Sequence, residues 1–229
     1  MKKILALSFF LLFSSGIRAS DDWGTWISNT YQTDFGGSDY LAFLELAPRT
    51  KNDNGDFSQI IVRPLVGYKL TKELSLWLGY TWQGEYTKGH EDEFDNATND
   101  IVEQLQWVHD LTPDLNFQYR FRVEQRFFAD ADVAYRLRQR FRFQYSIPDT
   151  KAYLIAFDEL FIYFNDLNYS PREGSVQQGI NQNRSYVGVG YKITPHINVD
   201  TGYQLQYVNN YGKQDLFNHV WLTNINVKF

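Results

Sequence analysis

Residues 115–145 read LNFQYRFRVEQRFFADADVAYRLRQRFRFQY, and the alternation along this stretch decides the fold. Apolar and aromatic side chains alternate with polar ones, and most of the polar ones are arginines. A period of two predicts two β-strands joined by the short connection 128–132, because a helix would spread the arginines around its circumference. The polar face carries the candidate lumen-lining residues Arg120, Arg122, Glu124, Arg126, Arg136, Arg138, Arg140 and Arg142.

The orientation of this hairpin is the next inference. A soluble hairpin would turn its apolar face to a core and its charges to water. The aromatic density, the length of the strands and the similar pattern elsewhere in the chain favour the opposite arrangement, with the apolar face toward lipid and the arginines toward a polar lumen. The sequence therefore predicts an all-β fold, a transmembrane antiparallel up-and-down β-barrel.

The composition agrees with a barrel. Aromatic residues make up 17% of the chain, yet the mean hydropathy of −0.45 is too polar for a helical membrane protein. In a barrel every second residue can be hydrophilic, which reconciles the two values. Beyond the N-terminus no apolar run approaches the ~20 residues that a membrane helix requires.

The first residues are typical of a targeting segment. Lys2 and Lys3 precede an apolar run over 4–13, and Ala19 ends a plausible cleavage site, so residues 1–19 are predicted to be a signal peptide and 20–229 a single barrel domain. The expected location is the outer membrane of a Gram-negative bacterium. The expected partners are outer-membrane lipid, lipopolysaccharide and the barrel assembly machinery.

Charge and cysteine content exclude several classes of function. Removing Lys2, Lys3 and Arg18 with the signal peptide leaves 19 of the 22 basic residues against 27 acidic ones. A mature charge near −8 argues against nucleic acid as a partner. The absence of cysteine excludes disulfides, thiolate metal sites and lipid attachment. No cofactor is expected.

The alternating stretches predict ten wall strands between Tyr40 and Phe229. Single-chain bacterial barrels have even numbers of strands. The further apolar stretch Trp23–Gln32 is therefore expected to lie at the periplasmic rim, to enter the lumen, or to split and give twelve strands. Short turns at 71–73, 112–114, 147–150 and 194–196 are assigned to the periplasmic side. Most loops on the other side are longer: 50–56, 87–100, 165–182 and 209–216.

Glycines recur at matched places in two predicted hairpins. Val66-Gly67-Tyr68 and Val189-Gly190-Tyr191 precede short turns at the same spacing. The tyrosines are expected to face outward and the glycines inward. An inward glycine leaves room for a large neighbouring side chain to cross a narrow lumen.

Several segments carry a resemblance. Trp221 and the terminal Phe229 resemble the C-terminal assembly signal of Gram-negative outer-membrane barrels. The stretches 181–184 (NQNR) and 188–191 (GVGY) are similar to a widespread bacterial family known only as a domain of unknown function. The match covers most of the mature chain and implies an outer-membrane β-barrel. It implies no activity and no catalytic residues.

Two interpretations of the arginine-rich face are open. An arginine-lined lumen would attract small anionic solutes and lower their barrier to entry, with Arg63 and Arg184 as outliers on other strands. Alternatively, the barrel is filled and non-conducting, with a structural or adhesive role, because buried arginines need counter-charges. The expected counter-charges are Glu124, Glu85, Asp200 and whichever of Asp158 and Glu159 faces inward.

Catalysis is disfavoured, and the chain is not expected to be an enzyme. Outer-membrane lipid hydrolysis or acyl transfer needs a histidine beside a nucleophile near one membrane face. Only His219 is suitably placed, and no serine lies within three residues of it. The acidic loop 90–100 could bind divalent cations that bridge to lipopolysaccharide, but its spacing matches no calcium loop. A solvated loop is expected there, with no metal site.

Overall fold

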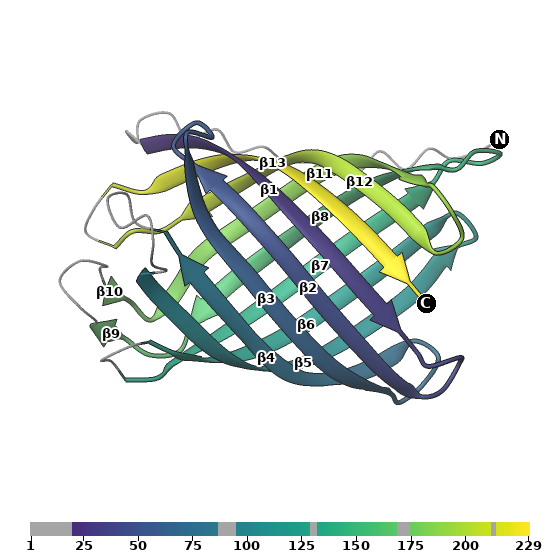
Figure 1. The fold of residues 1–229 in the computed structure, drawn as a ribbon, viewed down its shortest axis with the longest axis horizontal. Coiled ribbons are helices and arrows are strands. Elements are labelled where there is room, and N and C mark those ends of the chain that lie inside the picture. The colour runs from purple at the N-terminus through teal and green to yellow at the C-terminus, as the bar shows by residue number, and fades with distance from the viewer. Residues whose placement is uncertain (1–19, 87–94, 129–131, 169–174, 212–213) are drawn as a thin grey trace.

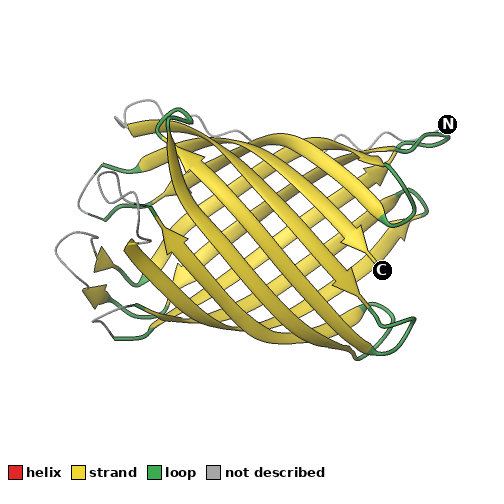
Figure 2. Ribbon diagram, in the orientation of Figure 1, coloured by secondary structure: helices red, strands yellow, loops and turns green. Residues whose placement is uncertain are grey.

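The computed structural model describes residues 20–86, 95–128, 132–168, 175–211 and 214–229. The predicted signal peptide lies outside these residues. Every regular element among the described residues is a strand (Figure 2). The described part of the chain contains no helix long and apolar enough to cross a membrane.

Eleven strands close into one barrel (Figure 1). Two further short strands, β9 (Leu167–Asn168) and β10 (Ser175–Val176), pair only with each other, beyond the end of β8. The wall strands are β1 (Ser20–Thr33), β2 (Tyr40–Lys51), β3 (Asp56–Lys69), β4 (Leu74–Glu85), β5 (Asp95–Thr112), β6 (Leu115–Phe127), β7 (Ala134–Ser146), β8 (Ala152–Tyr163), β11 (Gly179–Lys192), β12 (Ile197–Val208) and β13 (Leu216–Lys228).

The first strand corrects the predicted count of ten. β1 is a full wall strand that pairs antiparallel with β2 and parallel with β13, from Ser20 opposite Leu216 to Gln32 opposite Lys228. It neither lies at a rim, nor enters the lumen, nor splits. The number of strands must be even only where every pair of neighbouring strands is antiparallel. The parallel pairing of β1 with β13 allows an odd number. Figure 1 shows β1 and β13 side by side.

The pairing of β1 with β13 shows at which end of the barrel the described residues begin. We call the two ends of the barrel the turn end, which carries the short turns such as 70–73, and the loop end, which carries the connection 52–55 and the β9–β10 hairpin. Ser20 lies at the loop end, since it pairs with the start of β13, and Thr33 lies at the turn end.

The arginine-rich hairpin turns its polar face to the interior of the barrel. On β6, Arg120, Arg122 and Arg126 are buried while Phe121 is exposed. On β8, Glu159 is buried in the interior and Asp158 is exposed on the outside. The ambiguity between these two carboxylates is thus resolved in favour of Glu159.

Two strands begin earlier than predicted. β5 starts at Asp95 rather than at 101, and β11 starts at Gly179 rather than at 183. Residues 98 and 100 continue the inward pattern of Gln104 as buried polar side chains. Polar residues at the start of a strand look like loop in a sequence, because the apolar half of the alternation is missing there.

The interior also contains aromatic side chains. Trp26, Tyr153 and Tyr186 pack together with apolar residues of β13, and Trp77 packs in a second cluster. A Cβ on Gly67 would lie 2.6 Å from the Trp77 ring, and one on Gly190 would overlap the Tyr153 ring. The predicted role of the inward glycines is therefore confirmed.

Candidate functional site

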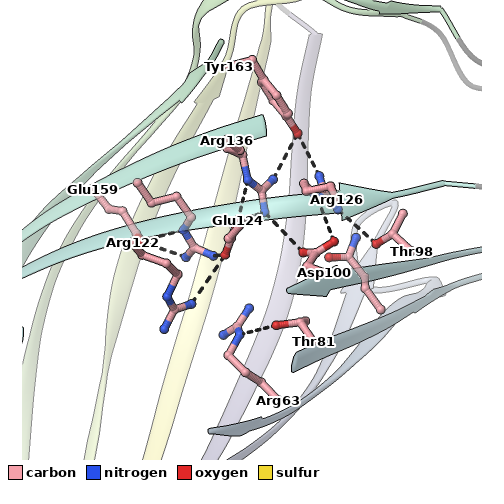
Figure 3. A network of polar contacts seen from close by, with 12 residues as sticks. Arg63, Thr81, Thr98, Asp100, Arg122, Glu124, Arg126, Arg136, Glu159 and Tyr163 are labelled. Carbon is pink, nitrogen blue, oxygen red and sulfur yellow. Dashed lines mark hydrogen bonds and ion pairs between the residues drawn. The ribbon is translucent and has the colours of Figure 1, made fainter. Parts of the chain in front are cut away.

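The interior polar network centres on Glu124 of β6, whose side chain is 0% exposed (Figure 3). Arg138 Nη1 donates to its Oε1 at 2.8 Å, and Arg136 Nε donates to its Oε2 at 2.6 Å. Arg122 Nη1 lies 3.7 Å from Oε1. The register of β6 and β7 explains this convergence, because Arg136 is directly opposite Glu124 and Arg138 is opposite Arg122.

Glu159 on the neighbouring strand β8 extends the network along the inner face of the barrel. Its Oε1 accepts hydrogen bonds from Arg138 Nε at 3.0 Å and from Arg120 Nη2 at 2.5 Å. Arg138 therefore bridges two buried carboxylates. Such charge-assisted pairs fix side-chain geometry where water is scarce.

A third group forms around Arg126. Its Nε donates to Asp100 Oδ1 at 3.1 Å, its Nη1 to the Tyr163 hydroxyl at 2.8 Å and its Nη2 to Thr98 at 3.1 Å (Figure 3). Each of the three nitrogens of this guanidinium therefore has a hydrogen-bond partner. Asp100 is buried on the inner face of β5, whereas the sequence analysis assigned it to an exposed loop.

Arg63 of β3 forms a separate group of contacts in the interior. It forms a short ion pair with Glu45 of β2 and donates from Nε to Thr81 at 2.8 Å. Arg122 Nε donates to Gln104 Oε1 at 2.9 Å. Arg63 is therefore an outlier on another strand, as expected, and no hydrogen bond or ion pair among the described residues links it to Glu124, Glu159 or Asp100.

The predicted counter-charges are partly right. Glu124 and Glu159 pair with arginines as expected. Glu85 instead accepts a hydrogen bond from Gln83 at 2.7 Å, and Asp200 accepts one from Tyr186 at 3.0 Å. Neither pairs with an arginine within 4.0 Å in the described structure. Two counter-charges, Glu45 and Asp100, were not predicted from the sequence. Gln104 and Gln106 were predicted to share one face of their strand, and counting back from them in steps of two places Asp100 on the same face.

Four interior arginines lack a carboxylate within 4.0 Å among the described residues: Arg49, Arg140, Arg142 and Arg184. Amides are the hydrogen-bond partners of the first three, at 3.1 Å for Arg49 and Gln59, 3.1 Å for Arg140 and Gln118, and 3.0 Å for Arg142 and Gln144. Arg184 lies over the rings of Trp26 and Phe161. We call these four the unpaired arginines.

Two cavities occupy the lumen, and the unpaired arginines are distributed over both. A cavity of about 690 Å³ toward the loop end is lined by Arg49 and Arg184, and one of about 980 Å³ toward the turn end by Arg142. Arg140 lines both. The side chains common to the two cavities are Ser28, Glu45, Arg120, Arg140, Phe157 and Asn224.

The junction of the cavities is thus built from charged side chains of both signs. At the junction, Glu45 forms an ion pair with Arg63, and Arg120 forms one with Glu159. Arg140 is the junction residue whose charge has no carboxylate partner in the described structure. A solute that moves from one cavity to the other must pass these side chains.

The outer face carries the remaining predicted residues. Trp221 is 51% exposed on β13, and Phe229 is 71% exposed at the C-terminus. His219 Nδ1 lies 2.7 Å from the Tyr203 hydroxyl, and the His219 ring stacks on Trp23. The part of the acidic loop before Asp95 lies outside the described residues. The described residues contain no group of three or more His, Cys, Asp or Glu side chains that could hold a metal ion.

Comparison with known proteins identifies the family. Residues 23–217 match the family described as "Protein of unknown function (DUF2490)". The chain belongs to the DUF2490 family. The matched range runs from β1 to the start of β13 and contains the whole arginine network, and the predicted family resemblance is confirmed.

The chain is also similar to an uncharacterized relative and to two solved structures. An uncharacterized protein of Methylorubrum extorquens is 27% identical over 232 residues, which cover 98% of this DUF2490 chain and 97% of the relative. A structure of the NanC porin is 16% identical with a TM-score of 0.48, over 89% of this chain and 99% of the other. OmpT of Vibrio cholerae is 12% identical with a TM-score of 0.41, over 77% and 58%.

Proposed function

We propose that this chain is a Gram-negative outer-membrane β-barrel that passes small anionic solutes through its arginine-lined lumen. The proposal includes outer-membrane lipid and lipopolysaccharide as the surroundings of the barrel, and the barrel assembly machinery as the system that inserts it. No catalytic step is part of it.

The outer surface supports the membrane location. Large apolar side chains are exposed on neighbouring strands, among them Val66, Leu78, Phe143 and Val189. Soluble monomers rarely expose contiguous apolar surface on this scale. A lipid-facing barrel wall requires it, because the bilayer interior offers no water for polar side chains.

The unpaired arginines are the observation that carries the proposed passage of anions. The six other interior arginines share four carboxylates, Glu45, Asp100, Glu124 and Glu159, so most of their charge is offset. The unpaired four keep their charge, and they follow one another from the loop-side cavity through the junction to the turn-side cavity. A low-dielectric wall around such a row raises the local concentration of anions and repels cations.

The paired arginines have a different part in this proposal. Arg126, Arg136 and Arg138 brace β5, β6, β7 and β8 through Asp100, Glu124 and Glu159. Their part in this proposal is the stability of the barrel, although the same side chains also line the loop-side cavity. The solute path uses the volume of the two cavities that the network leaves open.

Uptake by proteoliposomes tests the proposal. Vesicles containing the mature chain are given labelled succinate or, in parallel, labelled choline. We expect succinate to enter faster than choline, and we expect its entry to fall severalfold in the Arg140→Gln, Arg142→Gln double variant. Lys72→Gln, which removes a charge from an exposed turn outside the lumen, should leave entry unchanged. Entry of neither solute would establish the filled barrel instead, and faster choline entry would overturn the sign of the field.

The absence of lipid chemistry is proposed from the surroundings of His219. Its Nδ1 faces the phenol of Tyr203, and its Nε2 is 4.0 Å from Asp21. The oxygen beside this imidazole is a phenol, not the serine hydroxyl of a lipid hydrolase or acyltransferase. Incubation of the folded protein with labelled phospholipid should release no fatty acid. Release that is lost in His219→Ala would contradict this part of the proposal.

A further inference from the structure

Two of the unpaired arginines lie over the ring of Trp26 at the loop-side cavity. The Arg49 guanidinium carbon is 3.9 Å from the centre of the Trp26 ring, and that of Arg184 is 4.8 Å from it. The three residues come from β2, β11 and β1 and all line the same cavity. Because β1 supplies Trp26, this arrangement exists only in the eleven-stranded barrel.

Part of each guanidinium group is available to a ligand. With its amide oxygen turned toward Arg184, Gln182 accepts from Arg184 Nε at 2.6 Å and Nη2 at 2.9 Å, which leaves Nη1 of Arg184 for a ligand. An arginine that lies flat over an aromatic ring keeps its N–H donors in the guanidinium plane, pointing away from the ring. Arg49 uses Nη1 for Gln59, while its buried Nε has no hydrogen-bond partner in the described structure. A buried donor without a partner costs free energy that a bound acceptor would recover.

The positive charges of Arg49 and Arg184 also favour the binding of an anion. Two like-charged groups beside one ring repel each other, and neither has a carboxylate within 4.0 Å among the described residues. The nearest interior carboxylates on the cavity wall are already engaged, Glu45 with Arg63 and Glu159 with Arg120 and Arg138. An oxyanion between Arg49 and Arg184 would turn repulsion into two attractive contacts.

We infer that Arg49 and Arg184, held over Trp26, form a binding site for small organic carboxylates in the loop-side cavity. A planar carboxylate matches the fork of N–H donors on a guanidinium. A volume of about 690 Å³ leaves room for an organic body beyond the anionic group. Other amides at the wall, including Asn181 and Asn209, can give further hydrogen bonds to polar substituents of such a ligand.

This inference rests on the proposed function, because it names the class of solute that the path would hold near its loop end. A channel and a binding site nevertheless make separate demands. The channel needs both cavities and the junction at Arg140. The site needs only Trp26, Arg49 and Arg184, so equilibrium binding measures it without any transport.

Isothermal titration of the detergent-solubilised mature protein tests the site, with succinate, inorganic phosphate and choline as probes. We expect saturable succinate binding, weaker phosphate binding and no choline binding. The Arg49→Gln, Arg184→Gln double variant should bind succinate at least tenfold more weakly, a change equivalent to about 1.4 kcal/mol. Lys72→Gln should bind as the parent does. Arg49→Lys should recover only part of the affinity, because an ammonium group keeps the charge but loses the fork.

The controls separate this inference from the proposed function. Circular dichroism and heat-dependent gel mobility establish that each variant is a folded barrel, and Arg49→Lys provides a milder variant if the double one does not fold. Succinate binding without uptake would keep the site and overturn the passage. Uptake without saturable binding, phosphate binding tighter than succinate, or equal binding by the double variant would overturn the site.

Discussion

Arg138 donates a hydrogen bond to Glu124 at 2.8 Å inside the barrel, and Glu124 is 0% exposed. Two more arginines, Arg122 and Arg136, lie within 4.0 Å of the same carboxylate. One buried anion therefore offsets much of the repulsion between cations on neighbouring strands. Its charge, rather than its shape, is what the network requires.

Replacing that charge gives the first prediction. Glu124→Gln keeps the side-chain volume but leaves three arginines without their common counter-charge, and we expect a loss of about 3–5 kcal/mol in the free energy of unfolding. Denaturant titration in lipid vesicles measures it. Glu85→Gln makes the same chemical change at an interior carboxylate that is bonded to an amide, and should cost about 0.5 kcal/mol or less. Equal effects of the two substitutions would contradict the assigned role of Glu124.

The local part of this fold could be predicted from the sequence, because alternation is a local property. The arginines between Leu115 and Tyr145 were correctly predicted to face inward. With a period of two, the direction of one side chain fixes the direction of every other side chain in the same strand. The closure of the barrel could not be predicted in the same way. Pairing between β1 and β13 joins residues about 200 positions apart, and nothing in the alternation of Trp23–Gln32 distinguishes a parallel neighbour from an antiparallel one.

The site was predictable to the same extent. The hairpin arginines and Glu124 stand in an uninterrupted pattern, whereas Arg49, Arg63 and Arg184 are isolated basic residues in three separate strands. Only the closure of the barrel brings all three to the wall of one cavity. Asp100 was missed for a related reason, because its strand begins with polar residues that resemble a loop.

The parallel seam gives the second prediction. Ile27 of β1 is opposite Thr223 of β13, and the chain has no cysteine of its own. Cysteines at positions 27 and 223 should therefore form an intramolecular disulfide on mild oxidation, detected by a gel mobility shift that reductant reverses. Cysteines at 27 and 227 are offset by four residues, or about 13 Å along the strand, and should not cross-link. Equal cross-linking of the two pairs would contradict the register.

The third prediction concerns Glu103 on the outer face of β5. Its register partners lead through β4 and β3 to Ala42 near the turn end, and through β6 and β7 to Ile162 near the loop end. Glu103 therefore lies near half height, and it is exposed with no hydrogen bond or ion pair among the described residues. In a bilayer this carboxylate is costly, so Glu103→Leu should stabilise the barrel by about 1–2 kcal/mol.

Unfolding of the protein in lipid vesicles tests this third prediction. Glu103→Gln should lie between the parent and the leucine variant, because it removes the charge but keeps a polar group. A leucine variant that is no more stable than the parent would indicate that water, not hydrocarbon, covers this face.

The most direct test of the central claim is the reversal potential of single channels in a planar bilayer under a potassium chloride gradient. If the unpaired arginines set the field in the lumen, current through the parent protein should reverse near the chloride equilibrium potential. Arg140→Glu should move the reversal toward that of potassium, because Arg140 lines both cavities. A reversal near the potassium equilibrium potential in the parent, or no current at any voltage, would contradict the account.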